Sequence, residues 1–235
     1  MNKATLRAEY FAGLRATLPA APGVATFAMI CGAAMVAAGM PPVVAIAAGV
    51  IVYGGTLQLA AVQLLGSGAP LLLILLAGTV VNLRFMMFSA SIAPFLRRSS
   101  LARRLVMTCT LSDNGFASSY LHFTRPDAER KSQAERDAYY FGAATSIWVA
   151  WQTATVAGAL VGAAIPPEWR LEFTITLTFT ALGLANIRDR ATLAAAIAAG
   201  LTAVATHALP FRIGLVLGAV AGVAAGLAVE RLKER

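Results

Sequence analysis

The sequence contains eight long apolar stretches, and they restrict the chain to very few classes of fold. They run at about 17–39, 43–66, 70–96, 105–123, 139–164, 171–187, 190–208 and 211–229. Each approaches the roughly 20 residues that a helix needs to cross a bilayer. Only 13% of the residues are charged, against about 25% in a soluble domain. The sequence therefore predicts an all-α integral membrane protein, since an open sheet edge cannot be satisfied in lipid.

The basic residues indicate how these stretches are threaded through the membrane. If every stretch is a full span and the N-terminus is cytoplasmic, the four arginines of 97–104 lie outside. That violates the rule that Lys and Arg concentrate on the cytoplasmic side. The conflict disappears if 43–66 and 105–123 enter the membrane and return on the same side. We therefore predict about six full transmembrane helices plus two broken or re-entrant segments, with both termini cytoplasmic. Seven or eight complete spans are the alternative.

The two stretches predicted to return carry residues that are typical of broken membrane helices. The first has Gly54 and Gly55 at its centre, and Thr56 and Gln58 follow. The second has a polar run over 108–115. Irregular backbone within a membrane is tolerated only when it lines a cavity or is buried in protein. Both breaks are therefore predicted to lie beside a cavity or to be buried in protein.

The remaining segments fit a single polytopic domain that covers residues 1–235. Residues 1–16 are expected to form an amphipathic cytoplasmic helix, and 124–137 a polar cytoplasmic loop. The net charge of +8 comes from short clusters between apolar stretches, so a nucleic-acid partner is not expected. Cys31 and Cys109 lie in apolar surroundings and are expected to be buried rather than paired or bound to a metal.

Arg84 is the residue that most directly suggests a function. It has about a dozen mostly apolar residues on each side, and an arginine at the centre of a span costs about 2.5–3.5 kcal/mol to insert. A compensating partner is therefore required. That partner could be an internal carboxylate, or a bound anion, because a guanidinium group matches a carboxylate. The two interpretations are compatible, since a substrate can displace an internal partner.

Asp113 is the acidic residue that lies well inside an apolar stretch. It could pair with Arg84, bind a substrate ammonium, carry a coupling proton, or simply be solvated in a vestibule. Asn82 lies two residues before Arg84 and points to a different helix face. The predicted substrate-binding residues are Arg84, Asn82, Asp113, Gln58, Gly55 and Thr56, with Asp113 also the ion-coupling candidate. For Gly55, close helix packing is an equal alternative.

Motifs of the common membrane enzymes are missing from the sequence. It contains no P-loop, no HExxH and no second deeply placed Asp. An ATPase, a metalloprotease and an aspartyl protease therefore lack support, and neither an enzyme nor a cofactor is expected.

The chain resembles the AzlC-type large subunits of bacterial branched-chain amino-acid exporters. The likeness covers nearly the whole chain and is densest over about 13–120. The matching positions are Gly13, Leu18, Pro19, Gly23, Phe27, Gly32, Gly55, Gln58, Asn82, Arg84, Pro94, Asp113 and Phe116. Departures occur at Thr26, Ala28, Phe85 and Asn114, where family members often carry other residues.

This resemblance implies export of branched-chain or similar apolar amino acids across a bacterial inner membrane. It also implies a small membrane partner subunit of the AzlD type. An ion gradient is the expected energy source, because no ATP site is visible. Two alternatives stay open: an uncoupled channel or uniporter for small solutes, and a scaffold subunit that does not transport. The sequence leaves open whether the protein forms a homo-oligomer.

Overall fold

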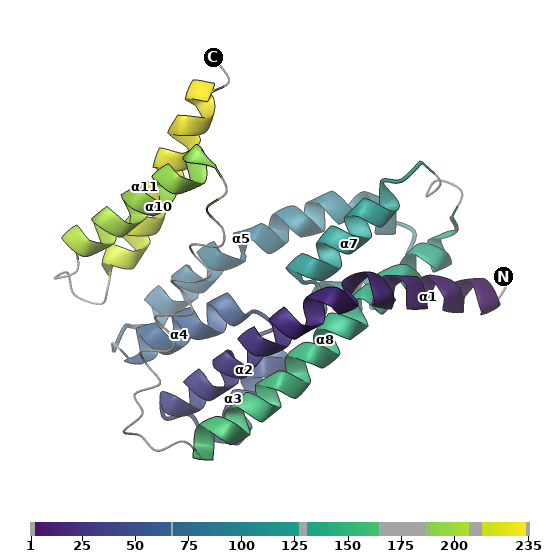
Figure 1. Ribbon diagram of the computed structural model, residues 1–235, viewed down its shortest axis with the longest axis horizontal. Helices are drawn as coiled ribbons and strands as arrows, with labels where there is room; N and C mark the ends of the chain where they lie inside the picture. Colours follow the sequence, from purple (N-terminus) through teal and green to yellow (C-terminus); the bar gives the residue numbers. More distant parts are fainter. Residues whose placement is uncertain are drawn as a thin grey trace. The chain divides into compact units, whose positions relative to one another are not determined.

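The protein is all-α throughout the part of the chain that the structure describes. The computed structural model describes residues 3–66, 68–126, 131–164, 187, 189–206 and 213–233. The chain divides into two compact units (Figure 1), unit 1 with residues 1–59 and 79–166, and unit 2 with residues 60–78 and 167–235. The helices are α1 (Lys3–Thr17), the 3₁₀ turn η1 (Leu18–Ala20), α2 (Ala21–Ala37), α3 (Pro42–Ile51), α4 (Gly55–Gly66), α5 (Leu71–Leu96), α6 (Leu101–Cys109), α7 (Asp113–Phe123), α8 (Gln133–Ala164), α10 (Arg190–Ala205) and α11 (Ile213–Lys233).

Among the described residues, three helical stretches are long and apolar enough to cross a membrane, which supports the predicted membrane protein. They are Lys3–Ala37, Leu71–Leu96 and Gln133–Ala164. The first runs without interruption through η1, because its prolines occupy first-turn positions where no intrahelical N–H bond is needed. Shorter apolar helices occur at α3, α4 and α10. The predicted span over 171–187 lies almost entirely outside the described residues, and the count of six full spans stays a prediction.

α1 and α2 pack along the length of α8 and form the scaffold of unit 1 (Figure 1). The contact is close because glycines face backbone atoms at both ends of it. A Cβ atom added at Gly142 would lie 1.9 Å from the Tyr10 carbonyl oxygen, and one at Gly158 would lie 2.0 Å from the Met29 carbonyl oxygen. Any side chain at these positions would push the helices apart.

The N-terminal helix is more firmly attached than the sequence suggested. We predicted an amphipathic cytoplasmic helix over 1–16; α1 forms there, continues into α2 and packs on α8. Thr17, at the end of α1, donates a hydrogen bond to the Ala143 carbonyl over 3.0 Å. This contact satisfies the buried hydroxyl and fixes the helix in place. Its cytoplasmic location stays a prediction.

The predicted polar loop over 124–137 is shorter in the structure, because α8 already begins at Gln133. Asp137 is buried in this first turn. Its carboxylate accepts hydrogen bonds from Ser99 (2.6 Å), Gln133 (2.9 Å) and Arg103 (3.0 Å). Three donors offset the cost of burying a charge. They also tie the start of α6 to the start of α8.

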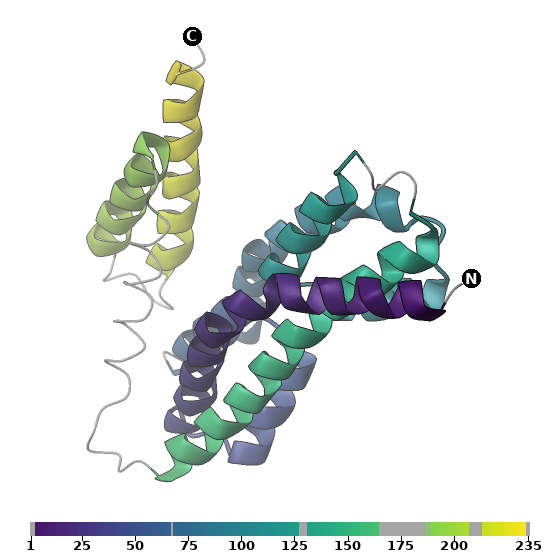
Figure 2. The same cartoon turned by 45° about the vertical axis from the view of Figure 1, so that its right-hand side comes forward.

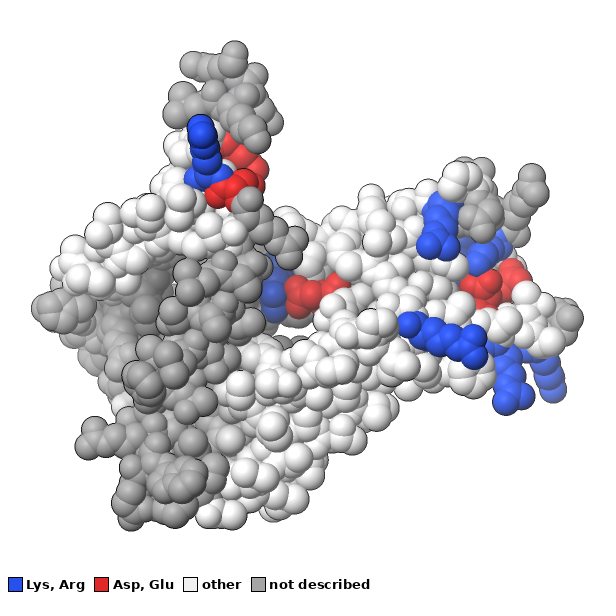
Figure 3. All heavy atoms as spheres, viewed as in Figure 1, with Lys and Arg blue, Asp and Glu red and all other residues white. Residues whose placement is uncertain are grey.

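The 105–123 stretch is broken as predicted, and both of its ends lie at the same end of α8. α6 and α7 are separated at residues 110–112. Near the end of α7, the His122 ring stacks on the Tyr139 ring with centroids 3.6 Å apart. Tyr139 lies two residues after Asp137 in α8. Figure 3 shows Lys and Arg side chains gathered at this end of unit 1, where the chain begins. Residues 105–123 therefore begin and finish at the same end of α8.

The 43–66 stretch is also broken as predicted, at residues 52–54 between α3 and α4. The Gln58 side-chain amide donates hydrogen bonds to the Val52 carbonyl and, over 3.3 Å, to the Ala48 carbonyl. α3 itself is held to α8 by a bond of 3.1 Å from Gln152 to the Gly49 carbonyl. Gln58 thus adds a second donor to each of two carbonyls that already accept from the backbone at Val52 and Gly54, and so ties α4 to the end of α3.

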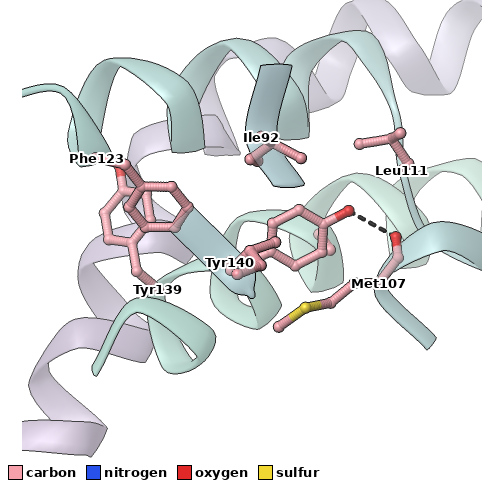
Figure 4. Packing of buried hydrophobic residues seen from close by; sticks show 8 residues of the cluster. Ile92, Met107, Leu111, Phe123, Tyr139 and Tyr140 are labelled. Atoms are coloured by element: carbon pink, nitrogen blue, oxygen red, sulfur yellow. Dashed lines mark hydrogen bonds between the residues drawn. The ribbon is translucent and has the colours of Figure 1, made fainter. Parts of the chain in front are cut away.

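An apolar cluster packs the α6–α7 hairpin against α5 and α8 (Figure 4). Tyr140 lies at its centre, and its hydroxyl donates a 2.7 Å hydrogen bond to the Met107 carbonyl. The cluster consists of Ile92, Leu96, Met107, Leu111, Phe123, Tyr139, Tyr140 and Ala144. Large side chains from four helices hold the break in a defined position.

In unit 2, α10 and α11 lie side by side (Figure 2). Glycines recur every fourth residue on α11, at 214, 218, 222 and 226, and all four face α10. The small residues therefore let these two helices pack closely. α10 begins with a capping box in which Asp189 accepts from the backbone of Thr192.

Candidate functional site

Arg84 lies in the middle of α5 and connects three helices of unit 1. Its Nη1 atom is 3.1 Å from Oδ1 of Asp113, at the start of α7. Its Nη2 atom donates a 3.1 Å hydrogen bond to the Thr56 hydroxyl, in the first turn of α4. The guanidinium carbon also lies 5.0 Å from the centre of the Phe85 ring, within cation–π range. Of the two partners that the sequence left open for Arg84, the internal carboxylate is present.

The two chain breaks bring helix N-termini to this arginine. α4 begins at Gly55 and α7 begins at Asp113. The first N–H groups of a helix have no intrahelical partner and carry a partial positive charge. Ser112 caps α7 by accepting a 3.2 Å bond from the Gly115 backbone. Two helix N-termini and a guanidinium group thus favour negative charge at one point.

A cavity of about 120 Å³ opens beside the ion pair. One part of its lining is polar and includes Thr56, Arg84, Ser112, Asp113 and Asn114, together with the backbone at Gly54 and Gly55. The other part is mainly apolar and consists of Val24, Phe27, Tyr53, Phe85, Ile147 and Trp151. The cavity therefore combines charged and polar groups with apolar and aromatic side chains.

The ion pair is accessible rather than sealed in the protein. The side chains of Arg84 and Asp113 are 38% and 51% exposed. Ion pairs this exposed contribute only about 0–1 kcal/mol to stability. Within the described residues, Nε of Arg84 is buried and has no hydrogen-bond partner. The pair can therefore open to a ligand at little cost, and one arginine donor still lacks an acceptor.

Four of the six predicted site residues meet at this cavity: Arg84, Asp113, Thr56 and Gly55. A side chain at Gly55 would collide with Phe27 and Trp151, each 2.5 Å from the added Cβ. Close packing and a place in the substrate site are therefore both compatible with the structure. Gly55 packs on the aromatic rings, and this contact also brings its backbone to the cavity.

The other two predicted residues lie elsewhere. Gln58 is 3% exposed and does not line the cavity, because its amide is bonded across the α3–α4 break. Asn82 lines a neighbouring cavity of about 410 Å³. That position agrees with the prediction that Asn82 and Arg84 point to different helix faces.

Sequence reasoning missed most of the aromatic lining. Phe27 and Trp151 come from the scaffold helices α2 and α8, and their rings lie 6.1 Å apart. In a membrane protein an apolar residue facing a cavity resembles one facing lipid, so the sequence carries no signal for them. Tyr53 could have been found, because it directly precedes the glycine pair.

The cysteines differ from expectation at one position. Cys31 is buried as predicted, but Cys109 is exposed and lines the larger neighbouring cavity. It is the last residue of α6, where the chain leaves the helix and packing ends. Among the described residues, no three His, Cys, Asp or Glu side chains lie close enough to hold a metal ion.

Comparison with known proteins assigns the family. The model of the AzlC protein family matches residues 19–165, a range that contains every predicted site residue. The chain belongs to the AzlC family. AzlC proteins are associated with branched-chain amino-acid transport, and their members are transporters rather than enzymes. Searches of curated proteins and of solved structures give no match.

Proposed function

We propose that this AzlC protein is the large subunit of a two-component secondary exporter for branched-chain or similar apolar amino acids. We place it in the bacterial inner membrane as a multi-pass protein. The observation that supports the substrate class is the mixed lining of the cavity, in which an accessible Arg84–Asp113 pair occurs together with apolar and aromatic side chains. An apolar amino acid has the same combination, since it carries two charges and an apolar side chain.

The substrate carboxylate would bind Arg84 and the ammonium would bind Asp113. The substrate carboxylate would replace Asp113 as the hydrogen-bond acceptor of Arg84. It would also offer an acceptor to Nε of Arg84, which has no partner among the described residues. The N-termini of α4 and α7 add favourable electrostatics for the carboxylate. The apolar side chain would contact the aromatic face formed by Phe27 and Trp151.

Asp113 is also the proposed coupling group. A carboxylate that pairs with Arg84 in one state and binds a proton in another would link substrate release to an ion gradient. Broken helices are the elements that move in many secondary transporters, because irregular backbone can change conformation locally. Here the two breaks, at 52–54 and 110–112, adjoin the cavity from two different segments.

The test is efflux from cells loaded with dipeptides that contain leucine, valine or methionine. Wild-type protein, Arg84→Gln and Arg98→Gln are compared, each with and without the small AzlD-type partner, and membrane levels are checked by blot. Arg98 is an exposed arginine outside the cavity, so its substitution controls for the loss of a positive charge.

We expect wild type and Arg98→Gln to export the amino acids, and an uncoupler to abolish the export. Arg84→Gln should reduce efflux by roughly 10- to 100-fold, the equivalent of losing hydrogen bonds to a charged group. Export that ignores the uncoupler would indicate a channel or uniporter. Normal export by Arg84→Gln in an assembled complex would leave only a scaffold role for the pair.

A further inference from the structure

A third cavity in unit 1 carries two arginines that lack a carboxylate partner. Its volume is about 130 Å³, and Arg97 and Arg104 lie at the end of α5 and in α6. Within the described residues neither forms an ion pair, whereas neighbouring Arg103 is bound to Asp137. The rest of the lining consists of Ser89, Ile92, Ala93, Leu96, Met107, Thr108, Leu111 and Tyr140.

The three cavities of unit 1 form a series, because each shares lining residues with the next. The arginine cavity and the 410 Å³ cavity share Ser89, Thr108 and Leu111. The 410 Å³ cavity and the Arg84 cavity share Tyr53, Gly54 and Phe85. The series follows α5 from its charged end to its middle, a distance of roughly 20 Å at about 1.5 Å per residue.

We infer that these cavities form the access route along which the substrate carboxylate travels from Arg97 and Arg104 to Arg84. The identity of that carboxylate as an amino acid rests on the proposed function. The route begins at the end of unit 1 where Lys and Arg gather (Figure 3), which is the cytoplasmic end by the charge rule. An exporter must take its substrate from that side.

The chemistry of the lining suits a passing anion. Two unpaired guanidinium groups attract a carboxylate and raise its local concentration. Ser89, Thr108 and Asn82 then provide polar contacts along the way, and apolar residues accompany the substrate side chain. Tyr53 and Phe85 line both the 410 Å³ cavity and the Arg84 cavity, so the substrate would pass them before it reaches Arg84.

Cys109 provides a native probe of this route, because it is exposed and lines the middle cavity. Inside-out vesicles that contain the complex are treated with a methanethiosulfonate reagent carrying either a sulfonate or a trimethylammonium group. The modification rate of Cys109 is followed by mass spectrometry. A charged reagent reaches a thiol in a water-filled route but not one that faces lipid.

The sulfonate reagent should modify Cys109 faster than the cationic reagent by on the order of tenfold, as expected for electrostatic steering. The double variant Arg97→Gln/Arg104→Gln should reduce this ratio to about one. Arg98→Gln should leave the ratio unchanged. Cys109→Ser removes the signal and shows that buried Cys31 does not contribute.

Unreactive Cys109, or a ratio that the double variant does not change, would overturn the route. The labelling needs no amino acid, so it is independent of the substrate assignment. Charge-selective labelling without leucine efflux would retain an anion route and reject the proposed function. Normal leucine efflux with unreactive Cys109 would retain the proposed function and reject the anion route.

Discussion

Unit 1 contains two kinds of helix, and the difference between them explains where its function lies. The scaffold, α1–α2 with α8, is continuous and is packed through glycines on backbone atoms. The segments α3–α4 and α6–α7 are each interrupted near the middle. Continuous helices satisfy their own backbone groups, whereas each interruption leaves N–H and C=O groups that need other partners. Residues of both interruptions, and the polar side chains next to them, line the cavity at Arg84.

The two kinds of helix should respond oppositely to substitution. Changes in the scaffold should reduce the amount of folded protein, because close packing leaves no space. Changes of cavity-lining side chains at the breaks should leave the protein folded and reduce transport, whereas buried Gln58 should affect stability as the scaffold does. Four predictions follow from this contrast.

The largest effect is expected in the scaffold, for Gly142→Ala. The new methyl group would lie 1.9 Å from the Tyr10 carbonyl oxygen, and overpacking of this kind costs about 1–3 kcal/mol or more. Size-exclusion chromatography of detergent extracts should show loss of most of the folded protein. Gly23→Ala is the matched control, because nothing lies within 4 Å of its added Cβ. Equal stability of the two variants would refute the glycine-packed scaffold.

At the second break, Asp113→Asn should lower efflux by about tenfold, since loss of a charged partner weakens binding by about 1.5–3 kcal/mol. The remaining efflux should no longer respond to an uncoupler, because the amide cannot carry the coupling proton. The fold should persist, since the cap on α7 comes from Ser112. Glu135→Gln, at the far end of unit 1, should behave as wild type. Unchanged efflux that keeps its uncoupler sensitivity would exclude Asp113 from coupling.

At the first break, Gln58→Leu should destabilise the protein by about 1–2 kcal/mol, because the two hydrogen bonds from the Gln58 amide to the Ala48 and Val52 carbonyls are lost. The midpoint of thermal unfolding in detergent should fall, and efflux should fall with it. Gln63→Leu tests the same change on the same helix, away from the break. If both variants unfold at the same temperature, Gln58 does not hold the break.

The smallest effect is expected for Thr56→Val, which keeps the shape of the side chain and removes one bond to Arg84. A loss of about 1 kcal/mol corresponds to about a fivefold higher half-saturating substrate concentration. Maximal efflux and stability should be unchanged. Thr153→Val, on the exposed face of α8, is the control. A lower maximal rate without any change in half-saturation would contradict a contact that only positions Arg84.

The sequence predicted the interrupted segments, α3–α4 and α6–α7, better than it predicted the continuous scaffold. Arg84 and Asp113 were found because a charge within an apolar stretch is costly and needs a partner. The breaks were found because the Gly54–Gly55 pair and the polar run over 108–115 interrupt otherwise apolar segments. These signals are local, so a single sequence contains them.

The missed features depend on contacts between distant segments. The sequence predicted a helix over 1–16 but not its packing on α8, because that contact joins segments more than a hundred residues apart. Phe27 and Trp151 line the cavity only because α2 and α8 pack together there. Gln58 was assigned to the substrate site because a polar residue beside a break could face either way. Its contact with the Ala48 carbonyl is set by how α4 folds back on α3.

The central claim is that the Arg84–Asp113 pair is a substrate site and not only a structural ion pair. It is tested most directly by the double reversal Arg84→Asp/Asp113→Arg in the purified complex with its partner. Binding of radiolabelled leucine is measured by scintillation proximity, and folding by size-exclusion chromatography. We predict a folded protein, because the reversed residues can still form an ion pair. It should no longer bind leucine, because the leucine carboxylate would meet the new carboxylate and the leucine ammonium would meet the new guanidinium group. Leucine binding at wild-type affinity in the reversed variant would contradict the account.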